Sequence, residues 1–446
     1  MNWQNWAGTA TATPARRYWP RTAEAIADAV RDAAAAGLVV RALGSGHSFT
    51  PAAATEGAAI DLSSWTGVIA ADASTGLVTL RSGTTLRELN AALDALGLAM
   101  PNMGDIDAQT ISGAICTGTH GTGAGLGGIA TQVEALELVT GDGELLSVSA
   151  TSHPEWLPAA RVSIGALGVI STVTLRCVPA FRLAADERPM RVEEVLDRFD
   201  EFAADNDHFE FYWFPYGGNA LVKRNNRITA PSAPAVPAPA GRPASPTPPP
   251  MPGWRRFYEY EVMENAAFGA LCRTGRAVPS LVRPLGKLAA ATLSARSYSA
   301  GSHQVFVTPR RVRFVESEYA VPRESVLEVL AELRRAVPRL SQPVMFPVEV
   351  RVAAADDAWL STAYGRDTAY IAIHQYTGMP HAEYFAAFES ITGSVGGRPH
   401  WGKMHTLDGS RLSELYPRFA DFLQVRDQAD PERRFANPYL DQVLGR

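Results

Sequence analysis

The length and composition of this 446-residue chain exclude several classes of protein. Its 41 basic and 46 acidic residues give a formal charge of −5, so the chain has no general attraction for nucleic acid. The three cysteines are too widely spaced for a disulfide framework or a CxxC metal site, and we expect no metal. The N-terminal residues do not resemble a secretory signal, and no run approaches the roughly 20 apolar residues that cross a bilayer. We therefore expect a soluble, cytoplasmic protein with two or three domains.

Short predicted strands and helices alternate over residues 1–178. Apolar spacing and terminal glycines predict two helices, over 21–37 and 85–97. The predicted strands cover residues 38–43, 58–65, 76–83, 132–149 (a hairpin with a Gly-Asp-Gly turn) and 164–179. These patterns predict one α+β domain that carries two glycine-rich loops.

A second α+β domain is predicted for residues 179–399. Its predicted strands cover residues 208–218, 312–322, 345–355 and 368–376. A helix is predicted over 323–337, and residues 254–297 also have helical apolar spacing. The Pro/Ala-rich tract 230–253 cannot sustain a helix or a sheet, so it predicts a surface insertion. We expect residues 400–446 to return and pack against the first domain.

The two glycine-rich loops are candidate anion sites. In Gly44-Ser45-Gly46-His47-Ser48, successive small residues let backbone N–H groups turn inward around an anion such as a pyrophosphate. Taken alone, the same loop is better explained as a solvated turn with a surface histidine. The second loop, 112–128, contains a formal GxGxxG match, but the match follows no buried strand and does not indicate a Rossmann fold.

Taken in order, these loops resemble the FAD-binding domain of vanillyl-alcohol-oxidase-type flavoproteins. The segments are GSGHS (44–48), PNMGDIDAQTISGAICTGTHGTG (101–123) and GALGVIS (165–171). Further along, Glu349-Val350-Arg351, YGRD (364–367) and HWGK (400–403) resemble sugar-1,4-lactone and alditol oxidoreductases, and HFEFYWFP (208–215) is more similar to the lactone branch. The resemblance implies an α+β, two-domain VAO/PCMH-type flavoprotein. Residues 1–178 would form the FAD-binding domain and residues 179–399 the α+β substrate (cap) domain.

The resemblance also implies how FAD is bound. His47 would attach the flavin covalently through its 8α-methyl group; a noncovalent FAD beside an uninvolved His47 is the alternative. The other implied FAD contacts are Gly44, Ser45, Gly46, Ser48, Ser112, Gly113, Thr117, Gly118, His120, Gly121, Thr122, Gly165, Gly168, Val169 and Ile170.

Four residues of the second half are the implied catalytic groups: Glu349, Arg351, His374 and Lys403. Glu349 and Arg351 are two apart on a predicted strand, so both point to one face. Negative charge develops on the substrate oxygen as hydride leaves, and a nearby Lys403 or Arg351 would stabilise it. The base would be His374 or a neutral Lys403, and that lysine would need its pKa lowered by burial.

Two implied substrate contacts depart from the alditol branch. Asp105 and Tyr376 stand where alditol-oxidising relatives carry Ser and Thr, which places an alditol pocket in doubt. Gly104 leaves space beside the flavin for oxygen and slightly favours an oxidase. We therefore predict oxidation of a D-arabinono- or L-gulono-1,4-lactone, with O₂ or another acceptor reoxidising FAD. An alditol oxidase, an oxidase of another sugar-like alcohol, and a binding protein without catalysis are the alternatives.

Residues 266–297 have two interpretations. Five basic residues, Arg273, Arg276, Arg283, Lys287 and Arg296, interleave there with apolar ones. The pattern favours ordinary helices with solvated arginines, and a peripheral membrane contact is the alternative.

Overall fold

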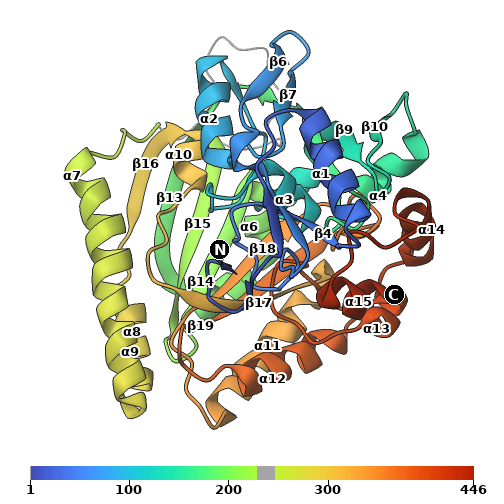
Figure 1. The fold of residues 1–446 in the computed structure, drawn as a ribbon. Helices are drawn as coiled ribbons and strands as arrows, with labels where there is room; N and C mark the ends of the chain where they lie inside the picture. Colours follow the sequence, from blue (N-terminus) through green and yellow to red (C-terminus); the bar gives the residue numbers. More distant parts are fainter. Residues whose placement is uncertain (1, 229–246) are drawn as a thin grey trace.

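A computed structural model describes residues 2–228 and 247–446 of the chain. Helices and antiparallel and parallel sheets are mixed, which confirms the α+β fold class. Most of the tract predicted as a surface insertion, residues 230–246, lies outside the described residues. Figure 1 shows one large sheet beside the smaller sheets of the N-terminal part of the chain.

The N-terminal part contains a parallel and an antiparallel sheet. The three-stranded parallel sheet has the order β3 (Arg16–Tyr18), β5 (Ala58–Asp61), β4 (Val40–Leu43). The five-stranded antiparallel sheet has the order β10 (Leu145–Ser149), β9 (Val133–Val139), β11 (Val169–Arg176), β7 (Leu77–Arg81), β6 (Val68–Asp72). Helix α1 (Ala23–Ala35) begins at Thr22, whose side chain accepts the N–H of Ala25. Helix α2 (Leu86–Ala95) begins with a capping box between Thr85 and Glu88.

An eight-stranded antiparallel sheet forms the second half. Its order is β16 (Arg296–Gly301), β13 (Arg182–Arg191), β15 (Asn219–Arg227), β14 (His208–Trp213), β18 (Val348–Ala353), β19 (Thr368–Tyr376), β17 (Phe314–Pro322), β20 (Arg398–Pro399). One face packs against α5 (Val192–Asp197), α6 (Phe199–Asp205), α11 (Val326–Ala336) and α12 (Ala382–Gly393).

Strand alternation separates an apolar face from a charged face on this sheet. On β14 and β18, Phe211 and Val350 belong to the core beneath the helices. Glu210, Glu349 and Arg351, one position away, therefore point to the opposite face. That face carries the candidate site.

The C-terminal segment shares a core with the N-terminal sheets. Helices α13 (Gly409–Leu415), α14 (Phe419–Ala429) and α15 (Pro438–Leu444) contribute to the same buried cluster as Leu80 of β7. The Arg41 guanidinium donates to the carbonyl of Phe435 at 2.6 Å, and the N–H of Val40 donates to Arg434 at 2.6 Å. Residues 400–403 contact both halves of the molecule, because the carbonyl of Trp401 accepts the hydroxyl of Thr50 and the N–H of His400 donates to the carbonyl of Glu318 on β17.

A helical hairpin lies along the outer edge of the large sheet. Residues 253–277 form one long helical run in Figure 1, made of α7 (Gly253–Arg256), the π-helix η4 (Phe257–Ala267) and α8 (Phe268–Ala277). Helix α9 (Val282–Ala291) follows it. These helices and their junctions expose apolar side chains: Trp254, Phe257, Tyr258, Val278, Leu281 and Leu288. In the described part of the chain, no helix is long and apolar enough to cross a membrane.

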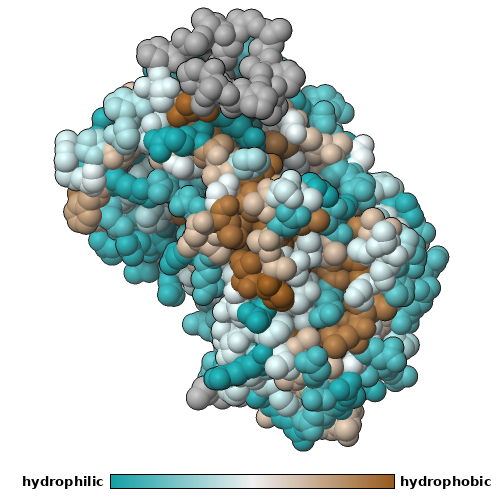
Figure 2. All heavy atoms as spheres, turned by 90° about the horizontal axis from the view of Figure 1, so that it is seen from above, coloured by the Kyte–Doolittle hydropathy of each residue, from teal (hydrophilic) through white to brown (hydrophobic). Residues whose placement is uncertain are grey.

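Hydrophobic residues also appear elsewhere on the surface. From above, Figure 2 shows them gathered in a strip through the middle of one face, with hydrophilic residues on both sides. Much of the surface of any folded protein is apolar, so this strip indicates no site by itself.

Candidate functional site

Three adjoining cavities make up the candidate site. The first is lined by the loop 44–48 after β4, by α3 (Ile111–Cys116) and the residue before it, and by residues 164–170 before β11. None of its lining residues is Asp or Glu. A glycine-rich, acid-free wall at the end of a strand suits a phosphate-containing group.

The wall of the first cavity fits the pyrophosphate part of FAD. Arg41 lines it, donates to the carbonyls of Ile164 (2.8 Å) and Gly165 (2.9 Å), and keeps a buried Nε that has no partner in the described residues. At Gly44 a Cβ would lie 2.5 Å from Oγ1 of Thr110, so only glycine lets the loop approach α3 this closely. The site therefore offers a close backbone and an unused donor.

The second cavity meets the first at His47. The two share the lining residues His47, Ser48, Gln109 and Thr117. The His47 ring stacks on Trp6 at 5.8 Å. Burial lowers the pKa of His47, and the positive charge of Lys403 lowers it further. A neutral imidazole is the form in which a ring nitrogen can act as a nucleophile.

Most of the residues expected to contact FAD line these two cavities. They are Gly44, Ser45, Gly46, His47, Ser48, Ser112, Gly113, Thr117, Gly165, Gly168, Val169 and Ile170 in the first cavity and His120 in the second.

Three of the expected FAD contacts, Gly118, Gly121 and Thr122, do not line a cavity. The Thr122 hydroxyl donates to the carbonyl of Phe209 and accepts the N–H of Val352 at 3.2 Å. At Gly121 a Cβ would lie 2.4 Å from the carbonyl of Met103. Thr122 thus joins the loop to the large sheet, whereas Gly121 packs against residues 102–103 of the N-terminal part.

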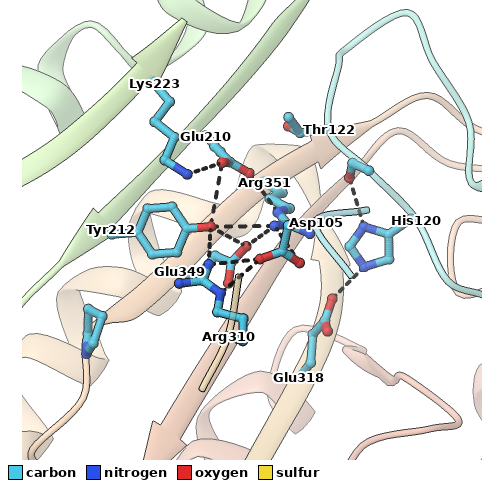
Figure 3. Close-up of polar contacts among 12 residues, drawn as sticks. Asp105, His120, Thr122, Glu210, Tyr212, Lys223, Arg310, Glu318, Glu349 and Arg351 are labelled. Carbon is cyan, nitrogen blue, oxygen red and sulfur yellow. Dashed lines mark hydrogen bonds and ion pairs between the residues drawn. The ribbon is translucent and has the colours of Figure 1, made fainter. Parts of the chain in front are cut away.

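His120 links the FAD loop to the large sheet. Its Nε2 lies 2.5 Å from Oε1 of Glu318 on β17, and its ring stacks on Tyr370 of β19. Burial would raise the pKa of Glu318, but its contact with His120 and the positive charge of Lys403 outweigh burial and hold that pKa well below its usual value. Figure 3 shows this pair beside, and separate from, the arginine cluster.

The third cavity lies over the charged face of the large sheet. It shares Asp105, Arg310, Arg351 and Lys403 with the second cavity. Glu349 and Arg351 on β18 form an ion pair there, as Figure 3 shows. Arg310 contacts Asp105 at 2.7 Å, and Arg351 lies 3.5 Å from the same carboxylate.

The pKa values of two buried carboxyl groups on this face shift in opposite directions. Burial raises the pKa of Glu349 above its usual value, even though Arg351 lies beside it. Burial would also raise the pKa of Asp105, but Arg310 and Arg351 outweigh it and hold that pKa well below its usual value. Asp105 is thus a permanent anion tied to two arginines, whereas Glu349 is the carboxylate that most readily takes a proton.

The surroundings of Lys403 correct the expectation of a neutral lysine base. Its Nζ lies 2.5 Å from Oε2 of Glu316 and 3.8 Å from Oε2 of Glu318. Burial lowers the pKa of Lys403, but these carboxylates outweigh burial and raise it above its usual value. Lys403 is therefore an ammonium group facing the cavity, because its neighbours are two carboxylates of β17.

His374 is also poorly placed as a free base. Its Nδ1 contacts the carbonyl of Pro347 at 3.1 Å, and its Nε2 lies 3.4 Å from Glu316. Burial lowers the pKa of His374, but Glu316 outweighs it and raises that pKa. Both ring nitrogens thus face acceptors, which favours the imidazolium.

Tyr376, an expected substrate contact, lies outside these three cavities. It lines a separate surface cavity with residues of η4 and α8. Its ring stacks on Phe346 at 6.5 Å, and Phe346 also contacts Phe314. The end of β19 is thus covered by aromatic side chains, and the structure does not bring Tyr376 together with the other residues expected to contact substrate.

Several residues of the site were missed in the sequence: Glu210, Tyr212, Lys223, Arg310, Glu316 and Glu318. Glu316 and Glu318 alternate within the apolar strand VRFVESEYAVP, a pattern like that of Glu349 and Arg351, and could have been found by the same argument. Arg310 precedes its strand and carries no periodic signal.

Known proteins resemble the chain over its whole length. Residues 14–149 match an FAD binding domain, and residues 173–443 match the D-arabinono-1,4-lactone oxidase family. An L-gulono-1,4-lactone dehydrogenase from Mycobacterium tuberculosis is 44% identical over 99% of both chains. An L-gulonolactone oxidase from Bos taurus is 33% identical (100% of this chain, 98% of the relative), and an alditol oxidase from Streptomyces sp. is 30% identical (99% and 98%).

The solved structures show the same fold. The cholesterol oxidase of B. sterolicum superposes with a TM-score of 0.83 at 17% identity, over 99% of this chain and 96% of that one. The fold and the joined cavities define a VAO/PCMH-type, FAD-dependent oxidoreductase. Within that class, the chain belongs to the D-arabinono-1,4-lactone oxidase family, and the predicted family is confirmed.

Proposed function

We propose that the protein oxidises an aldono-1,4-lactone of the L-gulono or D-arabinono type. The observation that carries the proposal is the third cavity, where Glu349, Arg351 and Lys403 face a space continuous with the FAD cavities. Family membership and a 44% identical L-gulono-1,4-lactone dehydrogenase support the choice of substrate. Asp105 is occupied by Arg310 and is not free to accept a chain of hydroxyls, which argues against an alditol.

The residues around this cavity have complementary roles in the proposed reaction. FAD, when bound, would accept the hydride from the carbinol carbon. Lys403 and Arg351 are cations that stabilise the negative charge developing on the substrate oxygen. Glu349 takes the hydroxyl proton: its raised pKa makes it a stronger base than an ordinary carboxylate. Its Oε2 lies 3.9 Å from Nε2 of His374, whose positive charge opposes the effect of burial and favours the ionised form of Glu349.

We also propose that His47 attaches FAD covalently. Its neutral ring lies where the first and second cavities meet, and the small neighbours Gly46 and Ser48 leave it accessible. After denaturation and precipitation, the flavin should stay with the wild-type protein and be released from His47→Ala. Flavin released from both proteins would contradict the covalent link while leaving FAD binding intact.

We propose O₂ as one acceptor. Gly104 lines the second cavity and has no side chain to obstruct it. Relatives named as oxidases and as a dehydrogenase both exist in this family, so the acceptor must be decided by measurement.

The test is anaerobic mixing of the purified flavoprotein with L-gulono-1,4-lactone, D-arabinono-1,4-lactone or xylitol, followed by air. Loss of flavin absorbance with a lactone and not with xylitol is the expected result. The matched control is Lys403→Met with FAD still bound, which should bleach at least about a hundredfold more slowly. Bleaching by xylitol alone would establish the alditol alternative, and rapid return of colour in air would establish an oxidase.

We further propose a peripheral contact of α8 and α9 with an anionic lipid surface. Arg273, Arg276, Arg283 and Lys287 are exposed there, next to the exposed apolar residues Val278, Leu281 and Leu288. Basic and apolar residues together are what an interfacial helix requires. Arg296 does not belong to this surface, because it is buried on β16 against Glu187.

A further inference from the structure

A row of alternating charges crosses the large sheet and ends at the candidate site. Arg296, Glu187, Lys223, Glu210 and Arg351 are direct cross-strand partners on β16, β13, β15, β14 and β18. Their signs run plus, minus, plus, minus, plus. Directly opposed residues in an antiparallel sheet have neighbouring side chains on one face. Three of the four neighbouring pairs in the row are ion pairs, and Glu187 acts on the fourth partner, Lys223, through its charge.

The pairs in this row are close and buried. Arg296 lies 2.6 Å from Glu187, Lys223 lies 3.1 Å from Glu210, and Arg351 lies 2.8 Å from Glu210. The Lys223 side chain is 9% exposed. Burial lowers the pKa of Lys223, but Tyr212, Glu210 and Glu187 outweigh burial and raise that pKa well above its usual value. Lys223 is thus a charged ammonium with acidic partners on both sides.

Lys223 does not line any of the three cavities, but both of its neighbours lead to the site. Glu210, its ion-pair partner, holds Arg351. Its Nζ also lies 4.7 Å from the centre of the Tyr212 ring, whose hydroxyl donates to Glu349 at 3.1 Å. Figure 3 shows Lys223 behind Glu210 and Tyr212, on the side away from Asp105.

Charge balance makes Lys223 necessary. The site holds three carboxylates, Asp105, Glu210 and Glu349, against the arginines 310 and 351. Lys223 is the third cation and brings the group to neutrality. Without Lys223, one buried carboxylate has no compensating cation, which is strongly unfavourable. Arg351 then interacts more with Glu210 and less with Glu349.

We propose that Lys223 is a positioning residue: by neutralising Glu210 and contacting Tyr212, it keeps Arg351 on Glu349 and keeps Glu349 ionised. The inference rests on the proposed oxidation of a lactone with Glu349 as base. Lys223 itself touches neither substrate nor FAD. Its effect should therefore appear in the ionisation of the site and not in substrate affinity.

The experiment compares four variants of the full-length holoenzyme. Lys223→Met removes the charge and keeps the length of the side chain, and Lys223→Arg keeps the charge. The double variant Lys223→Met with Glu210→Gln restores neutrality. Arg224→Met is the matched control, because Arg224 is the next residue on β15 and pairs with Asp186 on the opposite face.

The expected result is a change in the pH profile of kcat. In Lys223→Met the acid limb should move up by about one pH unit, which lowers kcat about fivefold at the wild-type midpoint and about tenfold well below it, with KM changed less than about twofold. The double variant and Lys223→Arg should recover most of the shift, and Arg224→Met should not show it. An infrared difference spectrum of Lys223→Met minus wild type should gain a protonated carboxyl band at neutral pH.

Two results would overturn the inference. One is a pH profile and an infrared spectrum of Lys223→Met that match those of Arg224→Met. The other is an equal loss of activity and of thermal stability in Lys223→Met and in the double variant, which would indicate a structural role alone. The infrared measurement needs no turnover. If the wild type oxidises no lactone, the proposed function is wrong, but the infrared spectra still test the role of Lys223.

Discussion

At the scale of single residues, the site depends on buried charges that need one another. Glu349 forms an ion pair with Arg351, Asp105 with Arg310, and Glu316 with Lys403. Removing one member of such a pair leaves the other buried without a partner, which typically costs about 3–5 kcal/mol. A substitution that keeps the shape of such a side chain but changes its charge therefore affects both catalysis and stability. Each such variant needs a matched control.

Glu349→Gln tests the base. If ionised Glu349 takes the proton, its raised pKa places the acid limb of kcat/KM above the pH at which an ordinary glutamate titrates, and activity falls as pH drops through that limb. Glu349→Gln should lose about a hundredfold or more of kcat and should lack the limb. The exposed Glu328→Gln on α11 is the control. An acid limb that persists in Glu349→Gln would assign the base elsewhere.

Gly104→Ala tests oxygen access. The added Cβ would lie 2.9 Å from the carbonyl of His120, so this wall of the second cavity must shift by a few tenths of an ångström. We expect reoxidation by O₂ to slow about tenfold, a barrier change of about 1.4 kcal/mol, while anaerobic reduction by lactone changes little. Gly125→Ala, where a Cβ meets nothing within 4 Å, is the control. Stopped-flow absorbance measures both steps, and an unchanged O₂ rate would contradict the prediction.

At the scale of elements, two strand pairs and one returning segment build the site. Strands β18 and β14 bring Arg351 opposite Glu210 in register. Strand β17 carries Glu316 and Glu318, and the segment after β20 brings Lys403 to both of them. Because the site is assembled on sheet strands, its geometry is held by the ladder hydrogen bonds and changes little with the surface helices.

The outer helices allow a separate test of lipid contact. Each basic residue near an anionic bilayer contributes about 1 kcal/mol, so Arg283→Glu combined with Lys287→Glu should weaken co-sedimentation with anionic vesicles at least about tenfold. Reversal of the exposed Arg411 on α13 should have no such effect, and neutral vesicles should not bind. Equal sedimentation of the double variant and wild type would remove the proposed contact, without consequence for catalysis.

At the scale of the whole molecule, buried neutral histidines join distant parts of the chain. His208 on β14 contacts the carbonyl of Thr122 at 2.8 Å, and His405 contacts the hydroxyl of Tyr439 at 3.0 Å. The ring of His400 accepts the N–H of Gly402 at 3.0 Å. Burial lowers the pKa of all three to about 4.

These histidines predict a loss of stability in mild acid. Each folded-state pKa lies below the unfolded value of about 6.5, so the unfolded chain binds more protons as pH falls. Their contribution is complete above pH 6.5 and is lost on the way to pH 4, at up to about 3 kcal/mol each. The apparent Tm of the holoenzyme should fall across this window, and His405→Gln should reduce the fall. The exposed His153→Gln is the control; a flat Tm from pH 6.5 to 4 would contradict the prediction.

The sequence by itself determined the family and much of the site. The order of residues along the chain was enough to predict the loop around His47, because a strand, small residues and a histidine are contiguous there. It was also enough to predict that Glu349 and Arg351 share one face, because side chains alternate along a strand. Only the tertiary structure decided the ionisation of the site. Lys403 is an ammonium because β17 brings Glu316 beside it, and Lys223 reaches Glu210 through strand pairing between segments that carry no common motif. A pKa depends on charges and burial within a few ångströms, and those neighbours come from distant parts of the chain.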